Sequence, residues 1–197
     1  MKLNNLWDGP HLIKVLKENG VVVMPTDTLY GIVGRAQHES VVHRIYELRK
    51  RAPHKPCIIL IGDISELGKF GIVPTLEQKK EIEKYRSAFA KGSGETRPTS
   101  FILDCLDEKF TYLHRGTKTL AFRLPANTDL QNLLKATGPL IAPSANTEGL
   151  PPAQNIQEAK KYFGDSVDLY IDAGEIKGKA SKVIRLNKDG LVEVLRP

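Results

Sequence analysis

Short apolar runs alternate with amphipathic segments along most of the chain. Continuous or alternating apolar residues predict strands at 21–24, 29–36, 57–61, 99–104, 119–125, 168–172, 181–186 and 191–195. Helical periodicity or a capping residue predicts helices at 9–18, 39–51, 75–90, 128–136 and 155–163. This interleaving is typical of an α/β fold in which helices pack on a sheet.

Turn and capping residues refine this picture. Thr75 is followed three residues later by Gln78, the spacing of a capping box, and Thr128 is expected to cap its helix. The segment NKDG at 187–190 predicts a hairpin, which is not a β–α–β unit, so the sheet is expected to be mixed. No linker divides the chain, which predicts a single domain over 1–197. Residues 91–98, KGSGETRP, are interpreted as a loop or lid.

The charge balance favours an anionic partner. Lys and Arg number 29 against 23 Asp and Glu, for a net charge of +6 and a pI near 9.2. A nucleotide, a phosphate or RNA would suit this balance, although many soluble enzymes are equally basic. Neither cysteine, Cys57 or Cys105, lies in a CxxC motif or near a histidine cluster, so no metal ligands are predicted. No signal-peptide core or membrane-spanning run is evident, and a cytoplasmic location is expected.

The segment MPTDTLYG places Thr26, Asp27 and Thr28 directly after a predicted strand. Ligands bind at strand ends in α/β folds, and two hydroxyls with a carboxylate suit a small polar molecule. The alternative is a plain turn whose hydroxyls bond to its own backbone.

The segment LRKRAPHKP carries four cations in seven residues: Arg49, Lys50, Arg51 and Lys55. Cations are favourable at a helix C-terminus, but this number exceeds what a cap requires. Because they repel one another unless an anion lies among them, we interpret the segment as a polyphosphate site.

Two further segments suit a polar ligand. Arg123 lies in the apolar strand TLAFRLP, where it either binds a carboxylate or lies on a solvent face. The segment PLIAPSANTEGLPPA offers Ser144 and Asn146 on a proline-stiffened loop whose single charge is Glu148. We expect this scarcity of acidic residues to suit a bound nucleotide. Ser144 has no evident histidine partner, which argues against a serine hydrolase.

The segments MPTDTLYGIVG, YELRKRAPHKP, LAFRLPA, IAPSAN, GLPPA and SKVIRL…VLRP occur in an order that resembles the YrdC/TsaC family, from about residue 9 to residue 197. The resemblance implies the short single-domain form, with a twisted mixed sheet flanked by helices and a basic concave cleft. It implies a threonylcarbamoyl-AMP synthase, which makes L-threonylcarbamoyl-adenylate and pyrophosphate from L-threonine, bicarbonate or CO2, and ATP with Mg²⁺. A separate transferase complex would then modify tRNA to t6A.

The resemblance also implies residue roles. Threonine would contact Thr28, Arg123, Ala142 and Ser181. ATP would contact Arg51, Lys55, Thr119, Ser144, Asn146 and Arg196, with Arg49, Arg51 and Lys55 acting by electrostatic positioning and no implied metal ligands. The chain departs from the family at Arg49, where a lysine is usual, and at Leu60, where longer members have a histidine. The segment GETRPTS replaces a PGPxT element, which makes Arg97 a candidate substitute there.

Two other functions are open at this point. A non-catalytic module for double-stranded or structured RNA would suit the basic charge, although no aromatic stacking platform accompanies it. A related carbamoyl-adenylate enzyme using carbamoyl phosphate, as in hydrogenase-maturation proteins, would carry acylphosphatase and zinc-finger domains that are not evident in residues 1–197.

Overall fold

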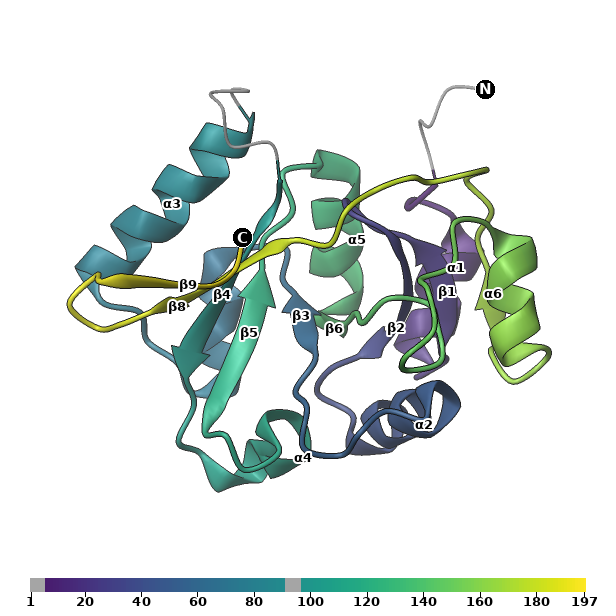
Figure 1. The fold of residues 1–197 in the computed structure, drawn as a ribbon, viewed down its shortest axis with the longest axis horizontal. Helices are drawn as coiled ribbons and strands as arrows, with labels where there is room; N and C mark the ends of the chain where they lie inside the picture. Colours follow the sequence, from purple (N-terminus) through teal and green to yellow (C-terminus); the bar gives the residue numbers. More distant parts are fainter. Residues whose placement is uncertain (1–5, 91–96) are drawn as a thin grey trace.

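The computed structural model describes residues 6–90 and 97–197, with the backbone alone for 87–90. Its strands are β1 (Val22–Pro25), β2 (Tyr30–Arg35), β3 (Ile58–Leu60), β4 (Thr99–Asp104), β5 (Thr119–Arg123), β6 (Leu140–Ile141), β7 (Leu169–Tyr170), β8 (Lys182–Leu186) and β9 (Val192–Arg196). They form one twisted sheet in the order β7-β1-β2-β6-β3-β5-β4-β8-β9 (Figure 1).

The sheet is mixed, as the sequence predicted. The pairs β1–β7, β3–β5 and β4–β8 are parallel, whereas β1–β2, β2–β6, β3–β6, β4–β5 and β8–β9 are antiparallel. The short strand β6 lies between β2 and β3, which brings the loop after β6 beside the ends of both.

The helices are α1 (Pro10–Lys17), α2 (Glu39–Arg49), α3 (Leu76–Ala90), α4 (Thr111–His114), α5 (Thr128–Thr137) and α6 (Ile156–Phe163), with 3₁₀ helices η1 (Ile64–Phe70) and η2 (Glu108–Phe110). The sequence did not predict η1, η2 or α4. Helix α2 ends two residues earlier than predicted, because Lys50 adopts a left-handed conformation with φ of 50°. The predicted cap at Thr128 is wrong: Asn127 accepts from Leu130 N, and Thr128 is the first helical residue. No helix of the described residues is long and apolar enough to cross a membrane.

Strand alternation divides the core between the two faces of the sheet. Val22 and Met24 of β1 pack with Leu60, α1 and α5 on one face. Val23 and Ile59 belong to the cluster on the other face, which also holds buried residues of α2, α3, α6 and η1. Leu60 is therefore a core residue and does not lie in a ligand cavity.

The first of these faces is left open over β3, β5, β4 and β8. Ile58, Ala121 and Ile102 lie side by side across three strands there, and Val183 of β8 joins them in lining a cavity. The residues that alternate with them, such as Phe101 and Phe122, are buried on the opposite face. This face is thus covered by α1 and α5 over one part of the sheet and forms a cavity floor over the other.

The capping box predicted at the start of α3 is confirmed and has a second role. Thr75 Oγ1 accepts from Gln78 N at 3.2 Å, and Gln78 Oε1 accepts from Thr75 N at 3.0 Å. The same two side chains donate to the β8–β9 hairpin, at Lys188 O (2.8 Å) and Leu186 O (3.0 Å). The helix start therefore also holds the hairpin in place.

We expect Thr75→Ala to lower the free energy of unfolding by about 1 kcal/mol, because it removes the cap and the hydrogen bond to Lys188 O. Thr75→Ser keeps the hydroxyl and should stay near wild type. Urea denaturation of the three proteins checks this. A Thr75→Ser loss as large as that of Thr75→Ala would show that the methyl group, rather than the hydroxyl, matters.

Candidate active site

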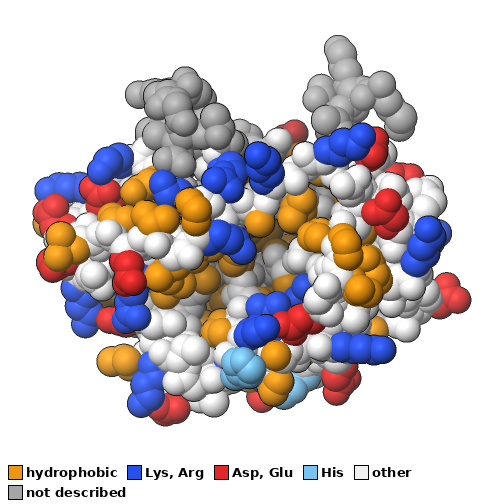
Figure 2. All heavy atoms as spheres, viewed as in Figure 1, with side chains coloured by type: hydrophobic (Ala, Val, Ile, Leu, Met, Phe, Trp, Pro, Cys, Tyr) orange, Lys and Arg blue, Asp and Glu red, His pale blue; other side chains and the backbone are white. Residues whose placement is uncertain are grey.

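A cavity of about 570 Å³ lies over the open part of the sheet. Figure 2 shows the hollowed centre of this face with Lys and Arg side chains around it. The charged residues that line the cavity are all arginines, namely Arg49, Arg51, Arg123 and Arg196, and no carboxylate is among the lining residues that the structure describes. A cavity lined in this way suits an anion, because guanidinium groups match carboxylate and phosphate geometry.

Arg123 is buried and paired. Its Nη2 lies 2.8 Å from Asp27 Oδ1, and the two side chains are 4% and 6% exposed. Arg123 Nε has no hydrogen-bond partner among the described residues. The solvent-face interpretation of Arg123 is therefore wrong. Asp27 does not line the cavity, so it serves as the counterion behind Arg123 rather than as the ligand contact expected for this loop.

In the turn at 26–29, the hydroxyl of Thr26 hydrogen-bonds to the backbone of the turn itself, as in the alternative interpretation of a plain turn. Thr26 Oγ1 donates to Leu29 O at 2.8 Å and accepts from Leu29 N at 3.3 Å. Thr28 lines the cavity, and its hydroxyl lies 3.1 Å from Thr26 Oγ1. A hydroxyl has one donor and two acceptor sites, so Thr28 keeps capacity for a ligand.

Arg49 ties the end of α2 to the loop after β6. The residue is 3% exposed, and its Nε donates to Asn146 O at 3.1 Å while Nη2 donates to Asn146 Oδ1 at 3.1 Å. Nη2 also lies 3.4 Å from Ser144 Oγ. Burial, and then the nearby Arg51, lower the pKa of Arg49. Arg49 Nη1 is buried with no partner among the described residues, which leaves one donor at the cavity wall.

Ser144 and Asn146 have different positions. Ser144 lines the cavity and donates from Oγ to Asn146 Oδ1 at 2.6 Å. Asn146 is 5% exposed, does not line the cavity, and donates from Nδ2 to Thr147 O and Leu150 O. Its amide is thus used within the loop, where it orients Ser144, and the predicted ATP contact of Asn146 stays a prediction.

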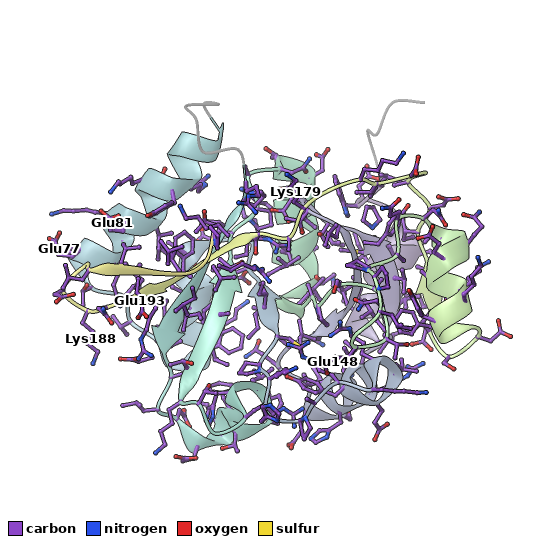
Figure 3. The ribbon with its side chains drawn as sticks, in the orientation of Figure 1. Glu77, Glu81, Glu148, Lys179, Lys188 and Glu193 are labelled. Carbon is purple, nitrogen blue, oxygen red and sulfur yellow. The ribbon has the colours of Figure 1, made fainter. Side chains whose placement is uncertain are left out.

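The basic loop after α2 is folded back on itself. Arg51 lines the cavity, and it donates to Lys55 O at 3.0 Å and to Pro56 O at 2.9 Å. Lys55 does not line the cavity, and its Nζ lies 2.6 Å from Glu148 Oε1. Figure 3 labels Glu148, which lies beside α2. The hydrogen bond from Lys55, followed by the one from Ala52 N, lowers the pKa of Glu148 to about 2.

The remaining predicted residues also line the cavity: Thr119, Ala142, Ser181 and Arg196. Arg196 donates from Nε to Ser181 O at 2.9 Å and from Nη2 to Ser181 Oγ at 3.2 Å. Burial lowers the pKa of Arg196, and the charges of Arg123 and Arg97 lower it further. Arg97 is therefore close enough to interact, although it does not line the cavity. Residues 91–96 of the predicted loop or lid lie outside the described residues.

Sequence reasoning did not single out Arg115, which does not line the cavity but packs on Tyr46. Its guanidinium carbon lies 4.0 Å from the centre of the Tyr46 ring, and its charge acts on cavity-lining Cys57. Its Nε and Nη2 have no partner among the described residues. No local signal marks Arg115, because α4, which positions it, was not predicted.

Comparison with known proteins decides the family. A model of the Sua5/YciO/YrdC family, described as "Telomere recombination", matches residues 14–197. The chain belongs to this family. The resemblance to YrdC/TsaC proteins is therefore confirmed.

Several Sua5/YciO/YrdC relatives carry a functional name. The threonylcarbamoyl-AMP synthase of Idiomarina loihiensis is 29% identical over 181 residues, which are 91% of each chain. That of Bacillus subtilis is 29% identical over 185 residues, which are 93% of this chain and 51% of the relative. P. abyssi Sua5 complexed with L-threonine superposes with a TM-score of 0.74 at 27% identity, over 98% of this chain and 54% of that one. The chain thus spans about half the length of the last two.

We expect Asp27→Ala to lower the free energy of unfolding by about 3–5 kcal/mol, because it leaves Arg123 buried without a counterion. Asp27→Ala with Arg123→Met should recover much of this loss. Asp104→Ala is the matched control, since Asp104 and Arg185 form an exposed pair 3.3 Å apart, where a loss of at most about 1 kcal/mol is expected. Urea denaturation measures all four proteins, and equal losses at Asp27 and Asp104 would contradict the buried pair.

We expect the Glu148 carboxyl to titrate near pH 2, well below the ordinary glutamate value of about 4.3. Since the folded pKa is depressed, the stability from this carboxylate is complete above about pH 4.3 and is lost as the pH falls towards 2. Lys55→Met should raise the pKa. Side-chain ¹³C NMR titration of both proteins measures it, and an ordinary pKa in the wild type would refute the Lys55 contact.

Proposed function

We propose that this protein is a threonylcarbamoyl-AMP synthase, which forms L-threonylcarbamoyl-adenylate and pyrophosphate from ATP, L-threonine and bicarbonate. The observation that carries the proposal is a cavity whose charged lining residues are four arginines, in a family whose relatives bear this name. We propose the cytoplasm as its compartment, and a separate transferase complex that passes the product to tRNA for t6A formation. Direct contact with tRNA stays a prediction.

Threonine binds, in this proposal, at the inner part of the cavity. Thr28, Arg123, Ala142 and Ser181 all line it. Arg123 receives the amino-acid carboxylate, while Asp27, whose Oδ1 lies 2.8 Å from Arg123 Nη2, is its counterion on the side away from the cavity. The complex of P. abyssi Sua5 with L-threonine supports a threonine site in this fold.

The triphosphate binds, in this proposal, among Arg51, Arg196, Thr119 and Ser144, which also line the cavity. Guanidinium forks and hydroxyls are suitable partners for phosphate oxygens. Magnesium enters as part of the MgATP substrate. The described residues contain no group of three or more His, Cys, Asp or Glu side chains that could hold a metal ion.

The reaction needs little chemistry from side chains. Bicarbonate takes up a proton and gives CO2 and water, and the neutral threonine amine attacks CO2 and releases a proton to solvent, which yields the carbamate. A carbamate oxygen then attacks the α-phosphorus, the bond between that phosphorus and the α–β bridging oxygen breaks, and pyrophosphate leaves. The arginines hold the two anionic substrates together against their repulsion and neutralise charge on the phosphates. Positioning and preorganised charge supply large rate factors in such transfers, which agrees with a cavity whose described lining residues include no His, Asp or Glu to act as a base.

The direct test is pyrophosphate release from ATP and bicarbonate with and without L-threonine, together with detection of the adenylate by mass spectrometry. Release that depends on threonine and on bicarbonate supports the proposal. Release no greater than with ATP alone rejects it. Adding tRNA in a separate binding assay addresses the RNA-binding alternative, which requires tRNA affinity without turnover.

We expect Arg123→Lys to raise the KM for threonine by about one to two orders of magnitude, because an ammonium cannot hold Asp27 and also grip a carboxylate through a planar fork. The KM for ATP should change much less. Arg185→Lys, on the exposed pair with Asp104, is the matched control and should change neither constant. Steady-state pyrophosphate release measures both, and an unchanged threonine KM in Arg123→Lys would reject the carboxylate role.

A further inference from the structure

Glu148 is the one acidic residue in the segment 139–153, and its carboxylate lies against the basic loop after α2. Oε1 accepts from Lys55 Nζ at 2.6 Å, and Oε2 accepts from Ala52 N. The Glu148 side chain is 23% exposed and that of Lys55 is 53% exposed. The carboxylate therefore pairs with Lys55, a cation that the resemblance to the YrdC/TsaC family assigned to ATP binding.

The position of Glu148 is set by contacts that do not involve its carboxylate. Glu148 N donates to Arg49 O at 2.8 Å. The Arg49 side chain in turn donates to Asn146 O and Asn146 Oδ1, both at 3.1 Å. Because these hydrogen bonds join the two loops independently, removing the charge of Glu148 should leave the loops together. Glutamine at this position can still accept from Ala52 N.

Lys55 lies next to residues of the cavity wall. Arg51 and Pro56, on either side of it in the sequence, line the cavity, whereas Lys55 itself does not. Arg51 and Tyr46 both donate to Lys55 O, at 3.0 and 2.8 Å, which holds the backbone of this residue at the wall. A lysine side chain is long and flexible, so its direction is decided by the nearest anion. In this structure that anion is Glu148.

We propose that Glu148 is a built-in competitor for Lys55, and that it weakens the binding of polyphosphate anions in the cavity by withholding this cation. The identity of the polyphosphate as ATP rests on the proposed function, but the competition does not. The anion that enters the cavity must either bind without Lys55 or displace a carboxylate from it. Both alternatives lower affinity relative to a loop in which Lys55 is free.

Glu148→Gln should therefore bind inorganic tripolyphosphate and ATP about two- to fivefold more tightly than wild type, the range expected for a partly exposed charge contact. The gain should disappear in the double variant Glu148→Gln, Lys55→Met. Lys55→Met alone should stay within about twofold of wild type, because Glu148 already occupies Lys55. The decisive quantity is thus the coupling free energy between positions 148 and 55 in anion binding, obtained from the two single variants and the double variant.

Glu81→Gln is the matched control. Glu81 also pairs with a lysine, Lys84, at 3.0 Å, and its side chain is likewise 23% exposed. It lies on α3, none of whose described side chains lines the cavity, and Figure 3 labels both glutamates at separate places on the molecule. The substitution changes the net charge by the same amount, so any effect of overall charge appears in both variants.

Calorimetric titration with tripolyphosphate and with ATP, each without threonine, measures the dissociation constants of all five proteins, and thermal unfolding verifies that each is folded. A gain in Glu148→Gln that depends on Lys55 and is absent in Glu81→Gln supports the proposal. An unchanged or weaker affinity in Glu148→Gln overturns it, as does a gain that persists without Lys55. If Glu148→Gln does not fold, a large loss in Lys55→Met alone overturns it.

The two proposals fail separately. Coupled tripolyphosphate binding without threonine-dependent pyrophosphate release would reject the synthase and retain the competitor. Threonine-dependent pyrophosphate release without coupling between Glu148 and Lys55 in tripolyphosphate binding would support the synthase and overturn the competitor. Absence of tripolyphosphate and ATP binding in every variant would overturn the competitor as well.

Discussion

The cavity depends on keeping guanidinium groups in a place where water cannot fully solvate them. Arg49 and Arg123 are each 3% exposed, and an unpaired charge at such a position would be strongly destabilising. Each of these cations has a partner nearby: Asn146 Oδ1 accepts from Arg49 Nη2, and Asp27 is the counterion of Arg123. The acceptors lie behind the guanidinium groups, so the cavity surface stays free of carboxylates among the described lining residues.

Other acceptors orient the two remaining arginines of the cavity. Arg51 is held by the carbonyls of its own loop, and Arg196 by Ser181. Charges that are already oriented need little reorganisation when an anion arrives, which is how preorganised sites stabilise charged transition states. The partners of Arg49 and Arg123 fix the positions of these guanidinium groups before an anion binds. Glu148 extends this arrangement to Lys55 at the edge of the site.

The open face of the sheet places these groups together. Helices α1 and α5 cover one part of this face, and the part over β3, β5, β4 and β8 forms the cavity floor. Loops that follow β1, α2 and β6 meet at its rim because β6 lies between β2 and β3. The positive charge is thus concentrated within a cavity of about 570 Å³, a volume that suits small-molecule substrates.

The sequence by itself determined the alternation of strands and helices, the capping box at Thr75 and the segments that meet at the site, because these signals depend on residues a few positions apart. The short helical turns η1 and α4 were missed: α4 has no side-chain cap, and the Asp63 cap of η1 is not followed by a long apolar pattern. Only the tertiary structure decided which charges meet. Asp27 reaches Arg123, and Glu148 reaches Lys55, because the strand order brings distant loops into contact. An ion pair needs only proximity of opposite charges, and no local pattern encodes that proximity.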